Sequence, residues 1–398
     1  MILAKFLNNL FKKGGFELID ANSKKHVIGN PKEKKPLIIK LFDKSLHYKL
    51  LFYPDFYFGE AYTEGTLTIE NGTLTEFLNM ALQNIGRKET NFFSEILNNI
   101  GGSYRYLTNF NFIKKSKINA ARSYDISDDL YDLFLDSKRQ YSCAYFKNEN
   151  DSLETAQNNK IEHIIKKLNI KPNQKVLDIG SGWGSLAIEI AKKTQCQVLG
   201  ITLSKNQFAY SNKKAKAMNM GNQVEFRLCD YREVEEKFDR IVSVGMFEHV
   251  GINFFPNFFL TTHKLLNDRG IFLLHTIGRN TPSRSTDPWT NKYIFPNGMI
   301  PSPAQISKSA QGLFVIEDWH NFGQDYDPTL MAWNENFQKS YDNLKDRYDE
   351  RFKRMWEYYL LMCAGTFRSR RNQLWQLILS KKGIKGGYSY QNSHRPNS

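Results

Sequence analysis

The sequence predicts an α/β protein in which a doubly wound, mostly parallel sheet follows a smaller N-terminal α+β domain. Beyond about residue 120, short apolar runs alternate with segments of helical periodicity, and short turns separate them. Such alternation is typical of a parallel sheet that helices cover on both faces. The first of these runs leads into a glycine-rich turn that opens a helix, as at the ligand-binding edge of such sheets. A chain of 398 residues is long enough for two domains.

The N-terminal third begins with a stripe of apolar residues at helical spacing, and Lys5, Lys12 and Lys13 fall outside it. The stripe is either an interfacial helix that lies on a bilayer or the buried face of a terminal helix. The sequence leaves both interpretations open. The stripe consists of Ile2, Leu3, Phe6, Leu7, Leu10 and Phe11.

The rest of this third has a more mixed pattern. Residues 37–42, 46–52 and 66–72 have strand-like composition, and the last segment ends in an Asn71-Gly72 turn. Helices are predicted over 74–83 and 91–100, and a lysine-rich linker follows them over 111–122. We therefore expect an N-terminal domain over 1–120, a second domain over 121–382 and a polar tail over 383–398.

The second domain has the more regular pattern. Its predicted strands are 175–179, 197–202, 224–229, 239–244 and 271–276, with helices over 185–193 and 204–219. Two further strands, 314–318 and 374–379, flank helices rich in Tyr, Trp and Arg. Residues from 381 onward are polar and Gly-rich, so we expect them to be disordered.

Composition excludes several classes of protein. No apolar run approaches the ~20 residues that a spanning helix needs, and the opening residues do not have the pattern of a signal peptide. The cysteines are scattered without a CxxC pair, which favours free thiols in a reducing cytoplasm over a disulfide frame or a zinc site. They are Cys143, Cys196, Cys229 and Cys363.

The net charge is +14, and residues 1–50 contain 11 lysines and 4 acids. Such a basic surface attracts nucleic acid or anionic lipid, or is simply solvated. Charge alone does not decide between these possibilities.

The most informative local motif is VLDIGSGWGS, residues 176–185. Gly180, Gly182 and Gly184 allow the backbone to turn sharply and to approach a ligand closely, and Asp178 supports the loop from below. The D-x-G-x-G-x-G spacing is that of S-adenosyl-L-methionine-dependent methyltransferases. A different nucleotide on the same fold is the alternative, whereas a Walker loop is excluded because no GK[ST] follows.

The segment at the end of the second predicted strand, 200–204, contains no acidic residue that could bind the ribose of the cofactor. The nearest polar candidates are Thr202, Ser204 and Gln207.

Seven sequence blocks, which follow one another along the chain, together resemble the cyclopropane-fatty-acid synthases and their mycolic-acid relatives. This resemblance explains the missing acid at the end of the second strand. The resemblance covers about residues 120–380 and implies a Rossmann-like class I methyltransferase sheet. Two departures from the family are Ser181 and Ser123. The blocks are YSCAYF (141–146), TLSKNQ (202–207), DRIVSVGMFEHVG (239–251), LLHTIG (273–278), DPWTNKYIFPNG (287–298), EDWHNFGQDY (317–326) and CAGTFRSRRNQLWQ (363–376).

The resemblance implies the residues of two sites. The cofactor contacts that it adds to the glycine loop and to Ser204 are Tyr141, Ser142, Thr202, Leu203, Gln207, Asp230 and Tyr231. It also implies a bound bicarbonate that serves as the base and is held by Cys143, Glu248, His275, the backbone of Ile277, and Tyr326. An anion beside a carboxylate requires a proton on one of them, so we expect a raised pKa for Glu248. Cys363 is an active-site residue by resemblance alone, since the chemistry needs no thiolate.

The implied activity is transfer of a methylene from S-adenosylmethionine to the cis double bond of an unsaturated phospholipid. The enzyme would be cytoplasmic, in peripheral contact with the inner face of the membrane and not with nucleic acid, as a monomer or a homodimer. Some aromatic residues would line an acyl tunnel, from a set that includes Tyr145, Phe146, Phe247, Trp289, Tyr293 and Trp319.

Three alternatives remain. The first is a related methyltransferase that makes a methyl branch, and the second is a non-catalytic lipid-binding protein. The third, a nucleic-acid methyltransferase, should show an Asn/Asp-Pro-Pro-Tyr/Phe motif, which the sequence lacks.

Overall fold

The computed structural model describes residues 1–32, 34–84, 128–282 and 286–389. The chain forms two compact units, neither of which is continuous in sequence. Unit 1 is Met1–Leu107, Arg284–Phe295 and Leu330–Arg371, and unit 2 is Thr108–Ser283, Pro296–Thr329 and Asn372–Ser398. The predicted helix over 91–100, the linker over 111–122, Ser123 and the boundary near residue 120 lie outside the described residues.

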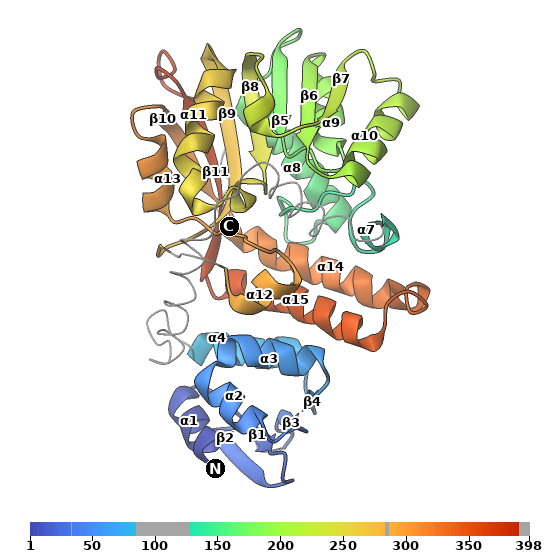
Figure 1. Ribbon diagram of the computed structural model, residues 1–398, viewed down its shortest axis with the longest axis vertical. Helices are drawn as coiled ribbons and strands as arrows, with labels where there is room; N and C mark the ends of the chain where they lie inside the picture. The colour runs from blue at the N-terminus through green and yellow to red at the C-terminus, as the bar shows by residue number, and fades with distance from the viewer. Residues whose placement is uncertain (33, 85–127, 283–285, 390–398) are drawn as a thin grey trace. The chain divides into compact units, whose positions relative to one another are not determined.

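Unit 2 contains a seven-stranded sheet of order β10-β11-β9-β8-β5-β6-β7 (Figure 1). β11 is antiparallel to both of its neighbours, and the remaining neighbours in the sheet are parallel. The order reverses at β5, which lies between β8 and β6. The strands are β5 (Lys175–Ile179), β6 (Gln197–Thr202), β7 (Val224–Leu228), β8 (Phe238–Val244), β9 (Leu266–Arg279), β10 (Val315–Asn321) and β11 (Asn372–Ser380).

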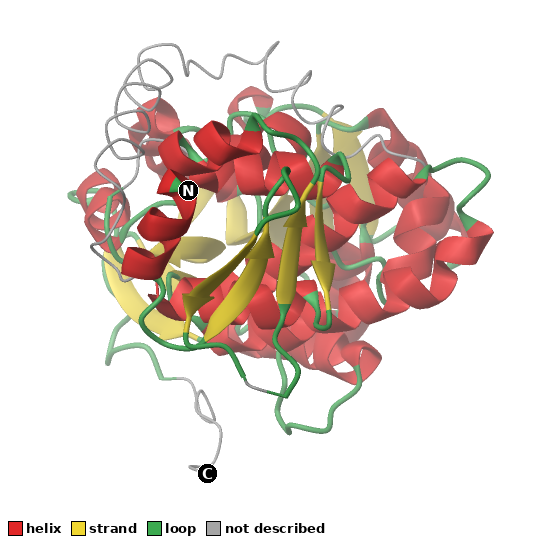
Figure 2. Ribbon diagram, turned by 90° about the horizontal axis from the view of Figure 1, so that it is seen from below, coloured by secondary structure: helices red, strands yellow, loops and turns green. Residues whose placement is uncertain are grey.

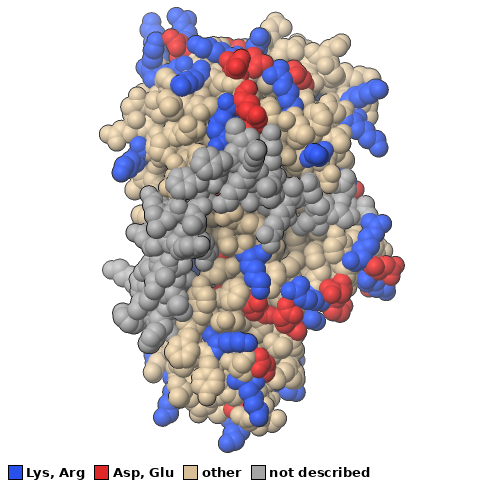
Figure 3. All heavy atoms as spheres, viewed as in Figure 1, with Lys and Arg blue, Asp and Glu red and all other residues tan. Residues whose placement is uncertain are grey.

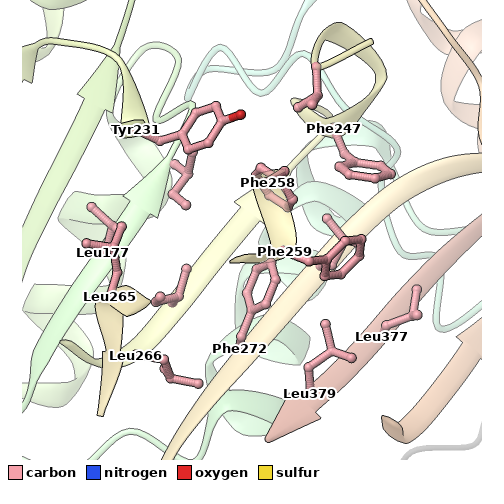
Figure 4. Close-up of a cluster of buried hydrophobic side chains, with 14 of the residues drawn as sticks. Leu177, Tyr231, Phe247, Phe258, Phe259, Leu265, Leu266, Phe272, Leu377 and Leu379 are labelled. Carbon is pink, nitrogen blue, oxygen red and sulfur yellow. The ribbon is translucent and has the colours of Figure 1, made fainter. Parts of the chain in front are cut away.

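Helices cover both faces of this sheet, as the alternating pattern predicted. Figure 2 shows the helices and strands of the chain from a second side. In β5, Val176 faces a core formed with α8, α9 and α10, whereas Leu177 faces a second core formed with α11 and α13. Phenylalanines from α11 and β9 fill much of the second core (Figure 4). These helices are α8 (Leu153–Leu168), α9 (Ser185–Thr194), α10 (Lys205–Ala217), α11 (Phe255–Leu265) and α13 (Pro303–Ala310).

The described part of the C-terminal tail contradicts the predicted disorder. Ile384 and Tyr388 contact the core on the α8 side of the sheet. The Tyr388 hydroxyl donates to the Lys167 carbonyl oxygen at 2.8 Å, and the Ile384 amide donates to Glu317 at 2.8 Å. Two apolar contacts and two hydrogen bonds therefore hold this polar segment, while residues 390–398 lie outside the described part.

Unit 1 contains a four-stranded sheet of order β2-β1-β3-β4. Its strands are β1 (Gly15–Ile19), β2 (Lys25–Gly29), β3 (Ile38–Leu41) and β4 (Leu67–Glu70). The helices that belong to it are α1 (Ile2–Leu10), α2 (Leu46–Phe52), α3 (Pro54–Thr63), α4 (Leu74–Asn84), α12 (Pro288–Tyr293) and α15 (Glu350–Arg368), and α14 (Tyr326–Ser340) begins in unit 2 and ends in unit 1.

The strand predicted over 46–52 is wrong, because this segment is helix α2. Leu46 and Leu50, four residues apart, are buried on one face of the helix, while Tyr48 and Phe52 are exposed on the other. Strands β1 and β2 and helix α3 were not predicted at all.

The N-terminal stripe is the buried face of α1, so the interfacial-helix interpretation of the stripe is wrong. Leu3 and Phe11 are buried, and Phe6, Leu7 and Leu10 contact the same core. Ile2 is 70% exposed and is the exception.

The C-terminal helix α15 packs on α3 and α4 within unit 1. The Tyr62 hydroxyl donates to Glu357 at 2.8 Å. Gly59 lies so close to the Trp289 and Tyr358 rings that an added Cβ would fall 2.6–2.7 Å from them. No helix in the described ranges is long and apolar enough to cross a membrane.

Candidate functional site

The glycine loop follows β5 at the point where the strand order of the unit 2 sheet reverses, which is where open α/β sheets bind ligands. The amides of Gly180 and Ser181 both donate to the Ile201 carbonyl, at 3.0 and 2.9 Å, and so tie the loop to β6. Gly180 and Gly182 have φ of +80° and +53°, in the left-handed region that favours glycine. A Cβ on Gly182 would enter open space.

That open space belongs to a pocket at the carboxyl ends of β5, β6 and β8. Ten of the twelve expected cofactor residues line it, which places residues far apart in sequence around one cavity. They are Tyr141, Ser142, Asp178, Gly180, Gly182, Thr202, Leu203, Gln207, Asp230 and Tyr231.

The other two, Gly184 and Ser204, do not line the pocket but begin helices. Gly184 is the N-cap of α9, and its position faces the Phe226 ring and Ser211 at 2.6 Å from an added Cβ. Ser204 is the N-cap of α10 and accepts a hydrogen bond from the Gln207 amide at 3.2 Å. Both residues therefore support the pocket indirectly, through the helices that they begin.

Asp178 is buried and lines the pocket, and its Oδ2 has no hydrogen-bond partner among the described residues. Burial raises the pKa of Asp178 to about 7. A buried carboxylate with an unpaired oxygen suits a ligand that carries a positive charge or a hydrogen-bond donor.

The polar groups at the end of β6 form a small network in place of the missing acid. The Thr202 hydroxyl donates to Gln207 Oε1 at 2.7 Å and accepts from the Ser204 amide at 3.2 Å. By contrast, the Asp230 carboxylate is bound at 2.7 and 2.8 Å by the guanidinium of Arg232 and caps the turn that follows β7. Asp230 therefore shapes the wall of the pocket through Arg232.

A second group of expected residues lies at the ends of β8 and β9. The Ile277 amide donates to Glu248 Oε1 at 2.6 Å. His275 is paired with Val244 of β8, and its Nδ1 is 3.2 Å from Gln376 Nε2. Glu248 Oε2 and His275 Nε2 are buried without a hydrogen-bond partner among the described residues.

Burial sets the protonation of both groups. Burial raises the pKa of Glu248 to about 7, against the opposing effect of the hydrogen bond from Ile277. The raised pKa was expected, but its cause here is burial and not a neighbouring anion. Burial also lowers the pKa of His275 well below its usual value, and the Lys160 and Lys167 ammonium groups add to this effect.

Three other expected residues lie together in unit 2. Cys143 is buried in an apolar cluster that Ile277 and Tyr326 contact. Cys363 instead lies on α15 in unit 1. Burial and the carboxylate of Asp287 raise the pKa of the Cys363 thiol, so it is a poor nucleophile.

Sequence reasoning missed Lys160, which lines the pocket. It is 2% exposed, and its Nζ donates to the Ser142 hydroxyl at 2.7 Å. Burial lowers the pKa of Lys160 to about 8. Gln157, Lys160, Ile164 and Lys167 share the buried face of α8, and polar residues on an apolar stripe are the signal that could have identified it.

The comparisons with known proteins agree with this geometry. The family described as mycolic acid cyclopropane synthetase matches residues 113–377. The cyclopropane-fatty-acyl-phospholipid synthase of Escherichia coli is 48% identical over 281 residues, which cover 71% of this chain and 72% of that protein. The tuberculostearic acid methyltransferase of Mycobacterium tuberculosis is 34% identical over 68% of this chain and 66% of that protein.

Solved structures show the same fold. The cyclopropane synthase of M. tuberculosis has a TM-score of 0.63 and 32% identity, covering 67% of this chain and 98% of that chain. A mycolic acid cyclopropane synthase in complex with S-adenosylhomocysteine has a TM-score of 0.63 and 31% identity over the same shares. With the glycine loop, the pocket and the buried Glu248 and His275 all in unit 2, this chain belongs to the mycolic acid cyclopropane synthetase family.

Proposed function

We propose that the chain is a cyclopropane-fatty-acyl-phospholipid synthase. It transfers a methylene from S-adenosylmethionine to the cis double bond of an unsaturated phospholipid acyl chain. The observation that carries the proposal is the presence, in one unit, of the glycine-loop pocket and of a buried carboxyl and imidazole with unpaired atoms. The 48% identity to the E. coli enzyme of that name supports the choice of substrate.

The pocket residues fit S-adenosylmethionine, whose sulfonium supplies an electrophilic methyl group. The open space at Gly182 admits the ligand close to the backbone. The unpaired oxygen of Asp178 suits the ammonium of the amino-acid end. Thr202 and Gln207 supply polar groups where other such sites have an acid.

Glu248 and His275 fit a bicarbonate, which would take up the proton that leaves the transferred carbon. Cys143, Tyr326, Glu248 and His275 would hold it, whereas the Ile277 amide, which donates to Glu248, would act through that carboxyl group. An oxyanion beside Glu248 is acceptable when that side chain carries a proton. The unpaired Glu248 Oε2 and His275 Nε2 are the atoms available for such a ligand.

Apolar side chains lie beside this site, which suits an intermediate that water would quench. Tyr145, Phe322 and Leu374 are buried beside Cys143. A dry site strengthens electrostatic interactions and prevents hydrolysis of a cation on the acyl chain. Phe247 does not contribute to it, since this ring stacks on Phe255 at 4.3 Å within the core (Figure 4).

We further propose peripheral contact with anionic membranes through unit 1. With the α1 stripe buried, the exposed aromatic residues Phe42, Tyr48 and Phe52 are the better candidates. Lys44 and Lys49 lie next to them in the sequence. In the face shown in Figure 3, basic side chains are spread over the surface and acidic ones lie among them. Exposed aromatic anchors are therefore a more specific indication of membrane contact than net charge.

The test is mass spectrometry of unsaturated phospholipid vesicles after incubation with S-adenosylmethionine. Ring closure adds the mass of one CH₂ group per cofactor consumed. A product two hydrogens heavier would replace this assignment with a methyl-branching enzyme. Unchanged lipids with bound cofactor would favour a non-catalytic lipid-binding protein.

A further inference from the structure

Three polar side chains, two of them buried, lie in one row across three adjacent strands of unit 2. His275 on β9 is the registered partner of Gln376 on β11, and Gln376 is the registered partner of His320 on β10. His275 and Gln376 are 1% and 0% exposed. Registered partners project from the same face of a sheet, so the row leads from the candidate base site to the edge strand β10.

The contact between the first two members fixes a direction of hydrogen bonding. Gln376 Nε2 lies 3.2 Å from His275 Nδ1. In this orientation of the Gln376 side chain the amide nitrogen donates, and Nδ1 accepts. A neutral imidazole carries one proton, and the hydrogen bond at one ring nitrogen determines which nitrogen carries it. This arrangement corresponds to the tautomer with the proton of His275 on Nε2.

The surroundings of the ring keep it neutral. Lys160 and Lys167 from α8 and His320 from β10 act on it electrostatically, with Glu248 at the end of β8 and Cys143 in the same region of unit 2. Burial and the two ammonium groups hold the pKa of His275 well below its usual value. His275 thus donates through one defined atom, and that atom has no partner among the described residues.

We propose that Gln376 is a positioning residue that holds His275 in the tautomer with its proton on Nε2, so that the ring donates a hydrogen bond to an oxyanion. The inference rests on the proposed function for the identity of that oxyanion as bicarbonate. With the opposite tautomer, the Nε2 lone pair would face the anion and repel it. Where a histidine binds a metal, a second residue that holds its ring in this way contributes about 10–100-fold to affinity or activity, and we expect an effect of the same order here.

The structure also supplies the variants that test this proposal. Gln376→Glu places an acceptor opposite Nδ1 with little change in shape, and so should put a proton on Nδ1. Gln376→Met keeps the volume but removes the hydrogen bond. Gln373→Glu makes the same chemical change three residues earlier on β11, where the side chain accepts from Asn321 at 3.1 Å instead of contacting His275.

The experiment is a two-bond ¹H–¹⁵N correlation spectrum of the full chain labelled at histidine, with His275 assigned from a His275→Ala variant. We expect protonated Nε2 and bare Nδ1 in the wild type and in Gln373→Glu, a proton on Nδ1 in Gln376→Glu, and exchange between tautomers in Gln376→Met. A proton on Nδ1 alone in the wild type would overturn the proposal. So would a wild-type pattern that survives in Gln376→Met or in Gln376→Glu.

Turnover supplies the second readout. Gln376→Glu should lower kcat about 10–100-fold, with an altered pH profile and an unchanged affinity for S-adenosylmethionine. Unchanged kcat together with a switched tautomer would overturn the role assigned to the ring proton. If the wild type forms no cyclopropane, the proposed function fails, while the spectra still decide whether Gln376 fixes the tautomer.

Discussion

The Ile277 amide lies 2.6 Å from Glu248 Oε1, so the backbone of β9 holds the carboxyl group of the turn that follows β8. This contact satisfies one oxygen and leaves Oε2 unpaired in a buried environment. A carboxylate placed there loses solvation that one amide does not replace, which is why the pKa of Glu248 rises to about 7.

The stability of the ligand-free protein should therefore depend on pH through Glu248. Between the ordinary glutamate pKa of 4.5 and the folded value of about 7, the folded state retains a proton that the unfolded state has released. Stability falls as pH rises through this window, and the full penalty applies above it. Glu248→Gln should thus stabilise the protein by about 3 kcal/mol at pH 8 and hardly at all at pH 4. Urea denaturation at both pH values tests this, with the exposed Glu235→Gln as control, and an equal effect at both would contradict it.

Two glycines of the same loop should respond differently to substitution. Gly182→Ala projects a methyl group into the open pocket, so it should abolish most S-adenosylmethionine binding, at a conformational cost of about 1–2 kcal/mol for positive φ. Gly184→Ala instead collides with Phe226 and Ser211 and should mainly lower the melting temperature. Calorimetric titration and thermal melting of both variants separate the effects. Normal cofactor affinity in Gly182→Ala would show that the ligand binds elsewhere.

The buried Lys167 should be more costly to leave unpaired than to remove. Its side chain is fully buried and donates to Asp318 at 2.7 Å, while Asp318 is 28% exposed. Asp318→Asn strands the ammonium group and should cost about 3 kcal/mol of unfolding free energy. Lys167→Met removes the charge, and the carboxylate left behind reaches solvent, so we expect a smaller loss. Equal losses in denaturant titrations would argue against this account.

Membrane binding should depend on α2 and not on α1. Tyr48→Ser with Phe52→Ser should weaken sedimentation with anionic vesicles about tenfold, because the two exposed rings lose apolar burial. Leu3→Ser should destabilise unit 1, because Leu3 is in its core. Met218→Ser, at an exposed site in unit 2, is the surface control. Vesicle binding that is unchanged in the α2 double variant would place the docking surface elsewhere, for example near Arg351 or Arg368.

The predictability of the fold differed between the two units for a physical reason. In unit 2, strands such as β5 and β6 are continuous apolar runs with clear turns, so their limits at 175–179 and 197–202 were predicted and are confirmed. In α2 the apolar positions fit a helix and a strand equally well, and only packing decides between them. The site residues were identified through motifs, whereas the roles of Lys160 and Gln376 depend on contacts with Ser142 and His275, which lie in distant segments of the chain.

The contact of α15 with α3 and α4 has a consequence for biosynthesis. At about 5–20 residues per second, the ribosome completes α15 on the order of 15–60 s after α4. Throughout this interval the surfaces around Gly59 and Leu82, which Tyr358 and Gly365 later cover, have no partner from the end of the chain. We therefore expect the nascent N-terminal segment to be prone to aggregation until α15 is made, and a fragment that stops near residue 120 to keep the same apolar surface exposed. The packing of α3 and α4 is complete only when α15 has been synthesised.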